Sequence, residues 1–372
     1  MSVRQPEFQP MTTGMSILPW QTGCRRSLHI VFLKMADHRP DRAPTASAKA
    51  TLKRIPGLVA GVRHLRTLWR RAKIAVNARA IAWGNGTRAR RLLVFEALPK
   101  RLVLAPHPQE SYVVNTADKV IGRSLYANGQ FDFQKFEIAC QLIRAHTGFA
   151  PDTAMPRYVL IDAGANIGSI CIPAVRRGLV ERAIAFELDP DNVRLLRINA
   201  ILNAVDDRID IRNMALGAAP GQVAIRHSKS NFGDHRVFLP DQGPDWGADQ
   251  GVDMAIAMVA LDSIANDLDL SRIILWMDIQ GYEVFALQGA QRFMAAGVPL
   301  ITEFSREELD STGSFETFLS IIAASGYEIF YDLNDPQPEP APVSIAALRA
   351  LSDRLERQKT FTDLLFLPDR TA

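Results

Sequence analysis

The stretch VLIDAGANIGS, residues 159–169, is an apolar run that stops at an acid and then breaks into glycines. Residues 159–163 are apolar nearly throughout, which is typical of a strand covered on both faces. Ligands of open α/β sheets bind beyond the carboxyl ends of such strands. Gly164 permits a tight turn there, Gly168 permits a close helix start, and Asp162 adds a carboxylate. The stretch therefore predicts the first strand of a ligand-binding sheet.

Downstream of this stretch, short apolar strands alternate with helical segments. The pattern predicts a mostly parallel, doubly wound, Rossmann-like α/β sheet, whose last two strands form an antiparallel pair. The expected strands are residues 158–164, 182–189, 208–216, 273–279, 298–304, 327–333 and 360–368. The expected helices between them are residues 166–178, 192–204, 282–297 and 314–326.

One connection in this pattern is much longer than the others. About sixty residues separate the third and fourth strands, and they include two strand-like segments, residues 222–228 and 254–264. Long connections inside compact domains are usually functional or disordered. We therefore expect the insert 217–260 and the segment before Val159 to determine substrate specificity.

The first 100 residues differ in charge from the rest of the chain. They hold 19 basic and 4 acidic side chains, a net charge of +15, whereas the other 272 residues hold 24 and 36, a net charge of −12. We expect a disordered leader at residues 1–50, which are rich in Pro, Ser, Thr, Ala and Arg. A basic extension of helix and β structure is expected at residues 51–150, and the main domain at residues 151–372.

The extension contains a predicted amphipathic helix, residues 58–83, whose apolar residues recur every three or four positions. Such a helix packs against a neighbouring domain or lies on an anionic membrane surface, and we favour the packing. Short strands and turns are expected at residues 92–135, followed by a helix at residues 133–148.

The three cysteines, Cys24, Cys140 and Cys171, are odd in number and widely spaced. They predict neither a disulfide framework nor a zinc site, and they favour a reducing, cytoplasmic setting. No apolar run approaches the roughly 18 residues that a membrane span needs.

An acid at the end of the second strand indicates which ligand the sheet binds. Glu187 follows Gly168 by 19 residues and is placed to accept the two hydroxyl protons of a ribose. The chain lacks both G-x-G-x-x-G and G-x-x-x-x-G-K-[ST], so no loop for a pyrophosphate is present and a dehydrogenase is disfavoured. A ribose site without a phosphate site indicates S-adenosylmethionine (SAM). The candidate cofactor-binding residues are Asp162, Gly164, Asn166, Gly168 and Glu187, together with Met214 and Ala215, which either contact the adenine or belong to the core.

Five motifs in order resemble the FkbM family of SAM-dependent methyltransferases. They are LIDAGANIGS, FELDPDN, LDSI, MDIQGYEVFALQGA and ITEF, and the similarity extends over about residues 118–368. The resemblance implies the seven-stranded class I methyltransferase sheet and O-methylation of a hydroxyl on a sugar, a glycan or a secondary metabolite. The family motif K-x-D-[VI]-E-G-x-E loses its Lys and its first Glu here, the latter replaced by Gln280. No role of those missing charges carries over.

Transfer of a methyl group to a hydroxyl benefits from a general base. His235 is the first candidate, because Asp234 can orient its ring; the alternative is an ordinary loop residue. Asp278 and Glu283 follow the fourth strand, where they can orient the acceptor, act as a base or cap the next helix. No metal is predicted, because Asp234 and His235 lack a third ligand at a readable spacing.

The basic N-terminal arm leaves a second functional class open. A nucleic-acid methyltransferase or binder would use such an arm. The arm has few aromatic residues, and the rest of the chain is acidic, so nucleic acid is not the expected partner. The sequence leaves the acceptor and the oligomeric state undetermined.

Overall fold

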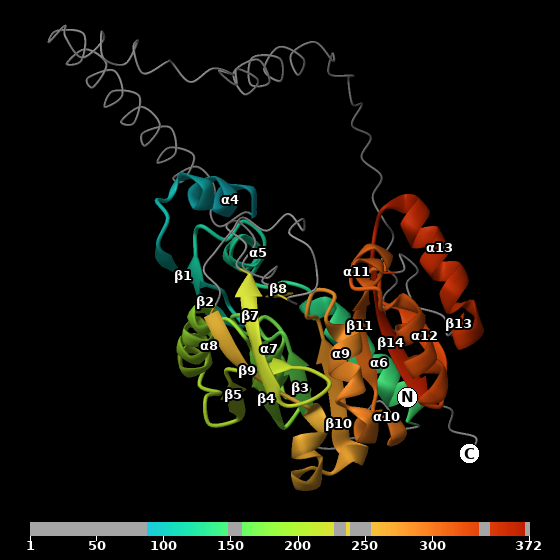
Figure 1. Cartoon of the computed structure of the whole chain (residues 1–372). Coiled ribbons are helices and arrows are strands. Elements are labelled where there is room, and N and C mark those ends of the chain that lie inside the picture. Colours follow the sequence, from blue (N-terminus) through green and yellow to red (C-terminus); the bar gives the residue numbers. More distant parts are fainter. Residues whose placement is uncertain (1–87, 148–157, 227–235, 239–253, 335–342, 369–372) are drawn as a thin grey trace, which may run out of the picture. The chain divides into compact units, whose positions relative to one another are not determined.

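The computed structural model describes residues 88–147, 158–226, 236–238, 254–334 and 343–368. The chain divides into two units, residues 1–74 and 75–372, and every described residue belongs to the second unit (Figure 1). The expected leader 1–50 and the basic helix 58–83 lie outside the described residues. The domain boundaries at residues 50 and 150 stay predictions.

The second unit is built around an eight-stranded sheet in the order β13-β12-β14-β11-β10-β3-β4-β5. Strands β5, β4, β3, β10 and β11 are parallel, and β14 is antiparallel to both β11 and β12. The strands are β3 (Val159–Ala163), β4 (Arg182–Phe186), β5 (Ile209–Arg212), β10 (Ile273–Met277), β11 (Leu300–Phe304), β12 (Tyr327–Asp332), β13 (Val343–Ser344) and β14 (Thr362–Pro368). The doubly wound α/β fold predicted from the sequence is therefore present.

The sheet differs from the expectation at its antiparallel edge. Seven strands were expected, and the eighth is β13, a two-residue strand that pairs with β12. The antiparallel pairing of the last two predicted strands is present, but β14 inserts between β11 and β12. The long path from β12 to β14 includes the helix α13 (Leu348–Gln358), so the short connection implied by adjacent pairing is wrong.

Alternate residues of the central strands enter two separate cores, one on each face of the sheet. Leu160, Ile274 and Trp276 belong to one core. Ile273 and Leu275, the residues on either side of Ile274, belong to the other core together with Val159. Side chains of successive strand residues point to opposite faces. Both faces are covered by helices, which is why these strands are apolar at nearly every position.

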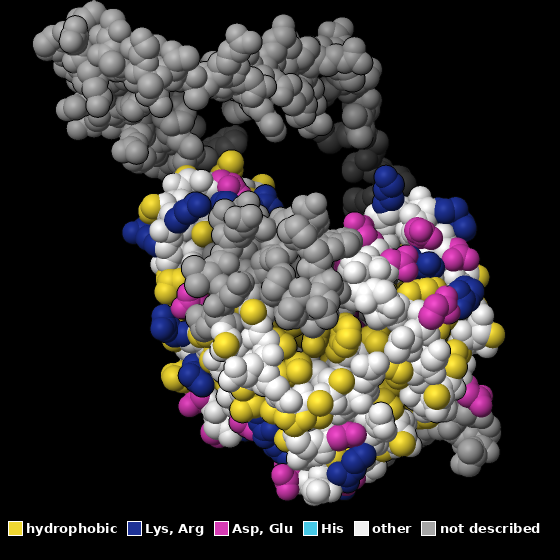
Figure 2. Space-filling model, in the orientation of Figure 1, with side chains coloured by type: hydrophobic (Ala, Val, Ile, Leu, Met, Phe, Trp, Pro, Cys, Tyr) yellow, Lys and Arg dark blue, Asp and Glu magenta, His cyan; other side chains and the backbone are white. Residues whose placement is uncertain are grey.

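Helices cover both faces. The first core contains residues of α4 (Arg88–Ala97), α5 (Ile121–Asn128), α6 (Phe133–His146), α7 (Cys171–Arg176) and α8 (Pro190–Leu202). The second contains residues of α9 (Glu283–Gln288), α10 (Gln291–Ala295), α11 (Arg306–Ser311), α12 (Phe315–Ala324) and α13. On the face shown in Figure 2, apolar side chains gather near α9, and most charged side chains lie towards the margin.

Some predicted helices have different bounds in the structure. The helix expected at residues 166–178 begins only at Cys171, because residues 164–170 form turns. The helix expected at residues 282–297 is two helices, α9 and α10, which are interrupted at Gly289. A Cβ at this glycine would lie 2.0 Å from the main-chain oxygen of Gly217, so the chain passes too close for a side chain.

The long insert contributes a second, four-stranded sheet in the order β6-β9-β7-β8. Its strands are β6 (Ala215–Leu216), β7 (Gly221–Arg226), β8 (Arg236–Phe238) and β9 (Met254–Val259). The third predicted strand, residues 208–216, is therefore wrong as a single element, because β5 ends at Arg212 and β6 joins the second sheet. The 3₁₀ segments Leu261–Asp267 and Leu270–Arg272 lead from this sheet to β10.

Residues 88–147 form the part of the extension that the structure describes. They comprise α4, the antiparallel strands β1 (Leu102–Pro106) and β2 (Ser111–Asn115), α5 and α6. The predicted strands and helix 133–148 are largely present, but residues 121–128 are helical rather than strand or turn. The 3₁₀ turn Ile345–Ala347 precedes α13 at the other end of the chain.

Asn199 of α8 and Asn203, which directly follows this helix, attach the extension to it. Asn199 accepts a hydrogen bond from the main-chain N–H of Val113 at 2.7 Å and donates to the main-chain oxygen of Ile167 at 3.0 Å. Asn203 exchanges hydrogen bonds with both main-chain groups of Ser111, at 3.0 and 2.7 Å. β2 pairs with β1 along one edge, and these two side-chain amides form hydrogen bonds with its main chain where a further strand could otherwise pair. The extension and the turn after β3 are held together by Asn199.

Within the residues that the structure describes, no helix combines the length and the apolar character that crossing a membrane requires.

Candidate active site

The site lies where the direction of strand addition reverses. The chain runs from β3 to β4 and β5 on one side, and later adds β10 and β11 on the other side of β3. Ligands of doubly wound sheets bind at this point, outside the carboxyl ends of the strands. The turn that begins at Gly164 and the loop that begins at Asp278 leave the two adjacent strands there.

Gly164 and Asn166 shape the first of these loops. Both have left-handed backbone conformations, with φ of 85° and 48°. The main-chain N–H of Gly164 donates to the oxygen of Phe186 at 3.0 Å, which ties the turn to the end of β4. The side-chain oxygen of Asn166 accepts from the N–H of Ile167 at 2.8 Å. The turn is thus fixed by its own hydrogen bonds and not only by the glycine.

Glu187 connects this turn to the helix that follows β4. One carboxylate oxygen accepts the main-chain N–H of Asn166 at 2.8 Å, and the other accepts that of Asp189 at 2.8 Å. The side chain is 5% exposed. Burial raises the pKa of Glu187 to about 7, although the two main-chain hydrogen bonds oppose this shift.

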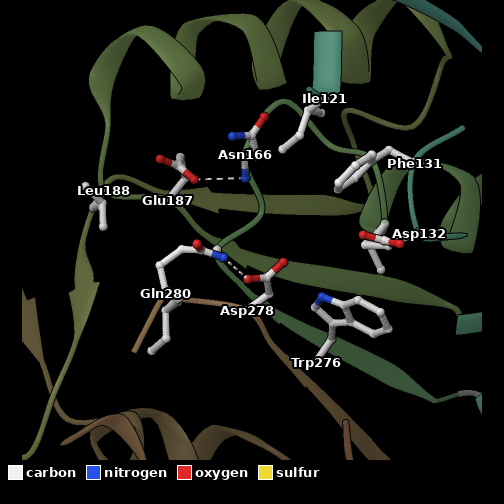
Figure 3. Close-up of a pocket in the computed structure, with 13 residues that line it drawn as sticks. Ile121, Phe131, Asp132, Asn166, Glu187, Leu188, Trp276, Asp278 and Gln280 are labelled. Carbon is white, nitrogen blue, oxygen red and sulfur yellow. Dashed lines mark hydrogen bonds between the residues drawn. The ribbon is translucent and has the colours of Figure 1, made fainter. Parts of the chain in front are cut away.

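A pocket opens between the turn, Glu187 and the loop after β10, as Figure 3 shows. Its empty volume, including the part open to solvent, is about 550 Å³. The pocket is lined by Ile121, Phe131, Asp132, Gly164, Asn166, Ser169, Ile170, Glu187, Leu188, Trp276, Asp278, Ile279 and Gln280.

A second, more apolar pocket of about 300 Å³ adjoins the first and shares Gly164, Leu188 and Ile279 with it. Its lining includes both predicted adenine contacts, Met214 and Ala215. The other residues of the lining are Ala163, Phe186, Leu216, Val237 and Tyr282. The structure thus places an apolar recess beside the ribose candidate Glu187.

Two predicted cofactor residues lie below the site and line neither pocket. Asp162 is 1% exposed, and its Oδ2 accepts the main-chain N–H of Cys171 at 3.1 Å. Burial raises the pKa of Asp162 to about 7. Gly168 has a φ of 95°, and a Cβ there would lie 2.4 Å from the Cδ1 of Ile172. Both residues support the turn in this structure.

Asp278 lines the first pocket, and Gln280 donates a hydrogen bond to its Oδ1 at 2.7 Å (Figure 3). Burial raises the pKa of Asp278 to about 7, and the nearby carboxylates of Asp363, Asp132 and Glu308 add to this effect. Its carboxyl group therefore titrates near neutral pH.

Glu283 lies behind the loop rather than in the pocket. It is 3% exposed, and its carboxylate accepts the main-chain N–H of Ile279 at 3.0 Å. Burial raises the pKa of Glu283 to about 8. Glu303, at the end of β11, also has a pKa raised well above its usual range, chiefly by burial. Glu283 and Glu303 are therefore two carboxyl groups near the loop after β10 whose pKa values are raised by burial.

Nine of the thirteen residues that line the first pocket were not predicted from the sequence, and four of them lie outside the turn after β3 and the loops after β4 and β10. Ile121, Phe131 and Asp132 come from the extension, and Trp276 precedes Asp278 in β10. The segment before Val159 was expected to affect specificity, but its residue types alone do not say which side chains face the site. Trp276 was hidden in a run of apolar strand residues.

The candidate base His235 and its neighbour Asp234 lie outside the described residues, so their role stays a prediction. Among the residues that the structure does describe, no three His, Cys, Asp or Glu side chains are grouped to hold a metal ion.

Solved structures with a similar arrangement include several methyltransferases. TYW2 of P. horikoshii, in complex with MeSAdo, is 15% identical over 73% of this chain and 73% of that chain, with a TM-score of 0.32. Geranyl diphosphate C-methyltransferase from Streptomyces coelicolor A3(2) is 16% identical over 63% and 76%, with a TM-score of 0.32. Precorrin-6y C5,15-methyltransferase from Geobacter metallireducens GS-15 is 10% identical over 57% and 80%, with a TM-score of 0.30.

A family comparison covers the part of the chain that carries most of the site. Residues 162–329 match the Methyltransferase FkbM domain. This range contains the turn after β3, Glu187 and the loop after β10, but not the residues that the extension contributes. The resemblance expected from the sequence is confirmed, and residues 162–329 form a methyltransferase domain of the FkbM family.

Proposed function

We propose that this protein uses SAM to methylate a hydroxyl group of a sugar, a glycan or a secondary metabolite. The observation that carries the proposal is the position of Glu187. Its buried carboxylate lies at the end of β4 and lines the first pocket, next to residues shared with the second, more apolar pocket. A nucleoside needs this combination of a hydroxyl acceptor and an apolar recess, and SAM is a nucleoside without phosphates.

The hydrogen bonds of Glu187 leave room for a ribose. Each carboxylate oxygen has two lone pairs, and each accepts one main-chain N–H at 2.8 Å. One lone pair on Oε2 is left for a ribose hydroxyl, and Oε1 has only a long 3.5 Å contact with Asn192 besides its main-chain bond. The adenine would occupy the second pocket, beside Met214 and Ala215.

SAM supplies, when bound, a methyl group that is already activated by its sulfonium charge. The protein must then hold the acceptor oxygen in line with that carbon at about 3 Å, which can contribute several kcal/mol. Asp278 is the described residue best suited to take the hydroxyl proton, because it lines the pocket and titrates near neutral pH. Glu283 accepts the main-chain N–H of Ile279 and so holds the loop that carries Asp278. Its role would be to position Asp278.

Isothermal titration calorimetry of the full chain with S-adenosylhomocysteine (SAH) tests the cofactor. We expect binding of SAH and no binding of NAD, and Glu187→Gln should weaken SAH binding at least tenfold. Glu328→Gln, which alters an exposed glutamate on β12, is the matched control and should leave the affinity unchanged. A wild-type chain that binds NAD but neither SAM nor SAH would disprove the proposal.

The hydroxyl acceptor is tested by transfer of an isotopically labelled methyl group from SAM. We expect labelled methyl ethers on sugars or on hydroxylated natural products, identified by mass spectrometry. Asp278→Asn should reduce the transfer rate at least a hundredfold while the affinity for SAH stays within threefold. Label found only on nitrogen or carbon would contradict O-methylation, and an unchanged rate would remove Asp278 from the chemistry.

A further inference from the structure

Asp132 occupies a helix-capping position but does not cap its helix. It directly precedes α6, where an aspartate side chain usually accepts a main-chain N–H of the first turn. Here it makes no such hydrogen bond, and its φ of 55° is left-handed. Aspartate is one of the few residues with a Cβ that adopt this region readily. The side chain therefore gives up a local hydrogen bond and lines the first pocket instead.

The contacts of Asp132 leave part of its carboxylate available. Its Oδ1 lies 2.8 Å from the Nζ of Lys135, which also contacts Asp363. In the described part of the chain, its Oδ2 has no hydrogen-bond partner. The side chain is 31% exposed, so one oxygen is free to meet a ligand in the pocket.

The lining of the first pocket holds acidic side chains and no basic one among the described residues. Three carboxylates line it, namely those of Asp132, Glu187 and Asp278, and no described Lys, Arg or His does. Lys135 is shared between Asp132 and Asp363, so one cation faces two acids. A positively charged ligand group near Asp132 would reduce this imbalance, whereas an anionic one would increase it.

The order of groups along the site shows which part of a ligand reaches Asp132. The apolar pocket with Met214 adjoins the side of the first pocket that carries Leu188. In Figure 3, Glu187 lies on that side and Asp132 on the opposite side, with Asn166 between them. A nucleoside with its base in the apolar pocket and its ribose on Glu187 would therefore extend its 5′ substituent towards Asp132.

We propose that Asp132 binds the α-ammonium group of the methionyl part of SAM. This inference rests on the proposed function and adds to it a residue from outside the family-matched range 162–329. The methionyl chain would cross the turn at Gly164 between the apolar side chains of Phe131 and Trp276. The methyl-donor site is then completed by the extension, which Asn199 and Asn203 attach to α8.

Two ligands that differ in the methionyl end test the proposal by calorimetry on the full chain. SAH carries the ammonium group, whereas 5′-methylthioadenosine has the same nucleoside and sulfur but no amino-acid end. The variant Asp132→Asn removes the charge and keeps the shape, and asparagine tolerates a left-handed backbone well. Asp267→Asn changes an exposed aspartate that makes no described ion pair, and it serves as the control.

We expect Asp132→Asn to weaken SAH binding at least tenfold and to change the affinity for 5′-methylthioadenosine by less than twofold. Asp267→Asn should change neither. Equal losses for both ligands, or an unchanged affinity for SAH, would overturn the role of Asp132 while leaving the methyltransferase proposal intact. A wild-type chain that binds neither ligand would instead overturn the proposed function and this inference with it. Thermal unfolding of each variant verifies that it is folded.

Discussion

The α-carbon of Gly164 lies against the main-chain oxygen of Asp278, so closely that a Cβ at Gly164 would be 1.9 Å from that oxygen. Gly164 begins the turn after β3, and Asp278 begins the loop after β10, the neighbouring parallel strand. The N–H of Asp278 in turn donates to the oxygen of Ala163 at 3.0 Å. The turn after β3 and the loop after β10 are therefore one packed unit, and a change in either will alter both.

This contact predicts a severe effect of Gly164→Ala. The new methyl group would overlap a main-chain oxygen, and the φ of 85° is also unfavourable for alanine. Overpacking and a left-handed backbone together should cost about 3 kcal/mol or more of unfolding free energy. Gly178→Ala is the control, because its φ is 71° but no atom lies within 4 Å of its Cβ, so it should lose only about 1 kcal/mol. Equal losses for the two variants in urea denaturation would show that the contact is unimportant.

The raised pKa of Glu187 predicts that cofactor binding depends on pH. Ribose hydroxyls donate to the ionised carboxylate, so binding favours the charged form and lowers the pKa of Glu187 below its free value of about 7. The affinity for SAH should then fall by up to tenfold per pH unit as the pH drops below 7.

Calorimetry between pH 5.5 and 8.5 measures this dependence. The matched variant Glu187→Gln cannot ionise, so its affinity should be lower and should vary less with pH than that of the wild type. Parallel pH profiles for the two proteins would show that another group controls the dependence.

The raised pKa of Glu283 predicts that the folded chain loses stability as the pH rises. An ion-paired acid with a lowered pKa would instead cause a loss of stability as the pH falls. The pKa of Glu283 is about 8 in the folded chain, against about 4.3 when unfolded. The folded state therefore keeps a proton that the unfolded state releases, and the stabilisation is fully present below pH 4.3 and lost as the pH rises towards 8. Glu283→Gln retains an oxygen that can accept the N–H of Ile279. It should raise the melting temperature relative to the wild type at pH 8.5.

The comparison at pH 4.5 decides whether titration causes this effect. There the folded side chain is protonated and the unfolded one is only about half ionised, so most of the effect is absent and Glu283→Gln should give little gain. The exposed Glu328→Gln should be neutral at both values. A gain of the same size at pH 4.5 and 8.5 would point to packing rather than to ionisation.

The strands β3, β4, β10 and β11 were predictable because each is short, largely apolar and buried. The glycines and acids at the ends of β3 and β4 predicted a site at the edge where the structure has a pocket, since parallel strands bring their carboxyl ends to one edge. The errors fall where tertiary contacts override local pattern. Residues 282–297 look like one helix, but Gly289 must lie against the oxygen of Gly217, and the helix breaks there.

Predicting the site residues had a similar limit. Glu187, which lines the pocket, was predicted because its distance from the glycine turn has a chemical meaning. Asp132 was missed because an aspartate just before a helix normally reads as a cap, and only the folded chain shows that this one does not cap. Its ion-pair partner Lys135 also contacts Asp363, more than 200 positions away in the sequence.

The attachment of the extension leads to a last prediction, for Asn199→Ala. Asn199 is fully buried and bonds the main-chain N–H and oxygen of Val113 and the oxygen of Ile167. Removing the amide leaves these buried main-chain groups without a hydrogen-bond partner. Each group that water cannot reach then costs about 1–3 kcal/mol of unfolding free energy. We expect a loss of about 2 kcal/mol or more in urea denaturation, whereas Ile198→Ala, at a site 39% exposed, should lose clearly less. Because Ile167 belongs to the turn after β3, SAH binding should weaken as well. Loss of stability with full SAH affinity would show that the extension folds against α8 without supporting the cofactor turn.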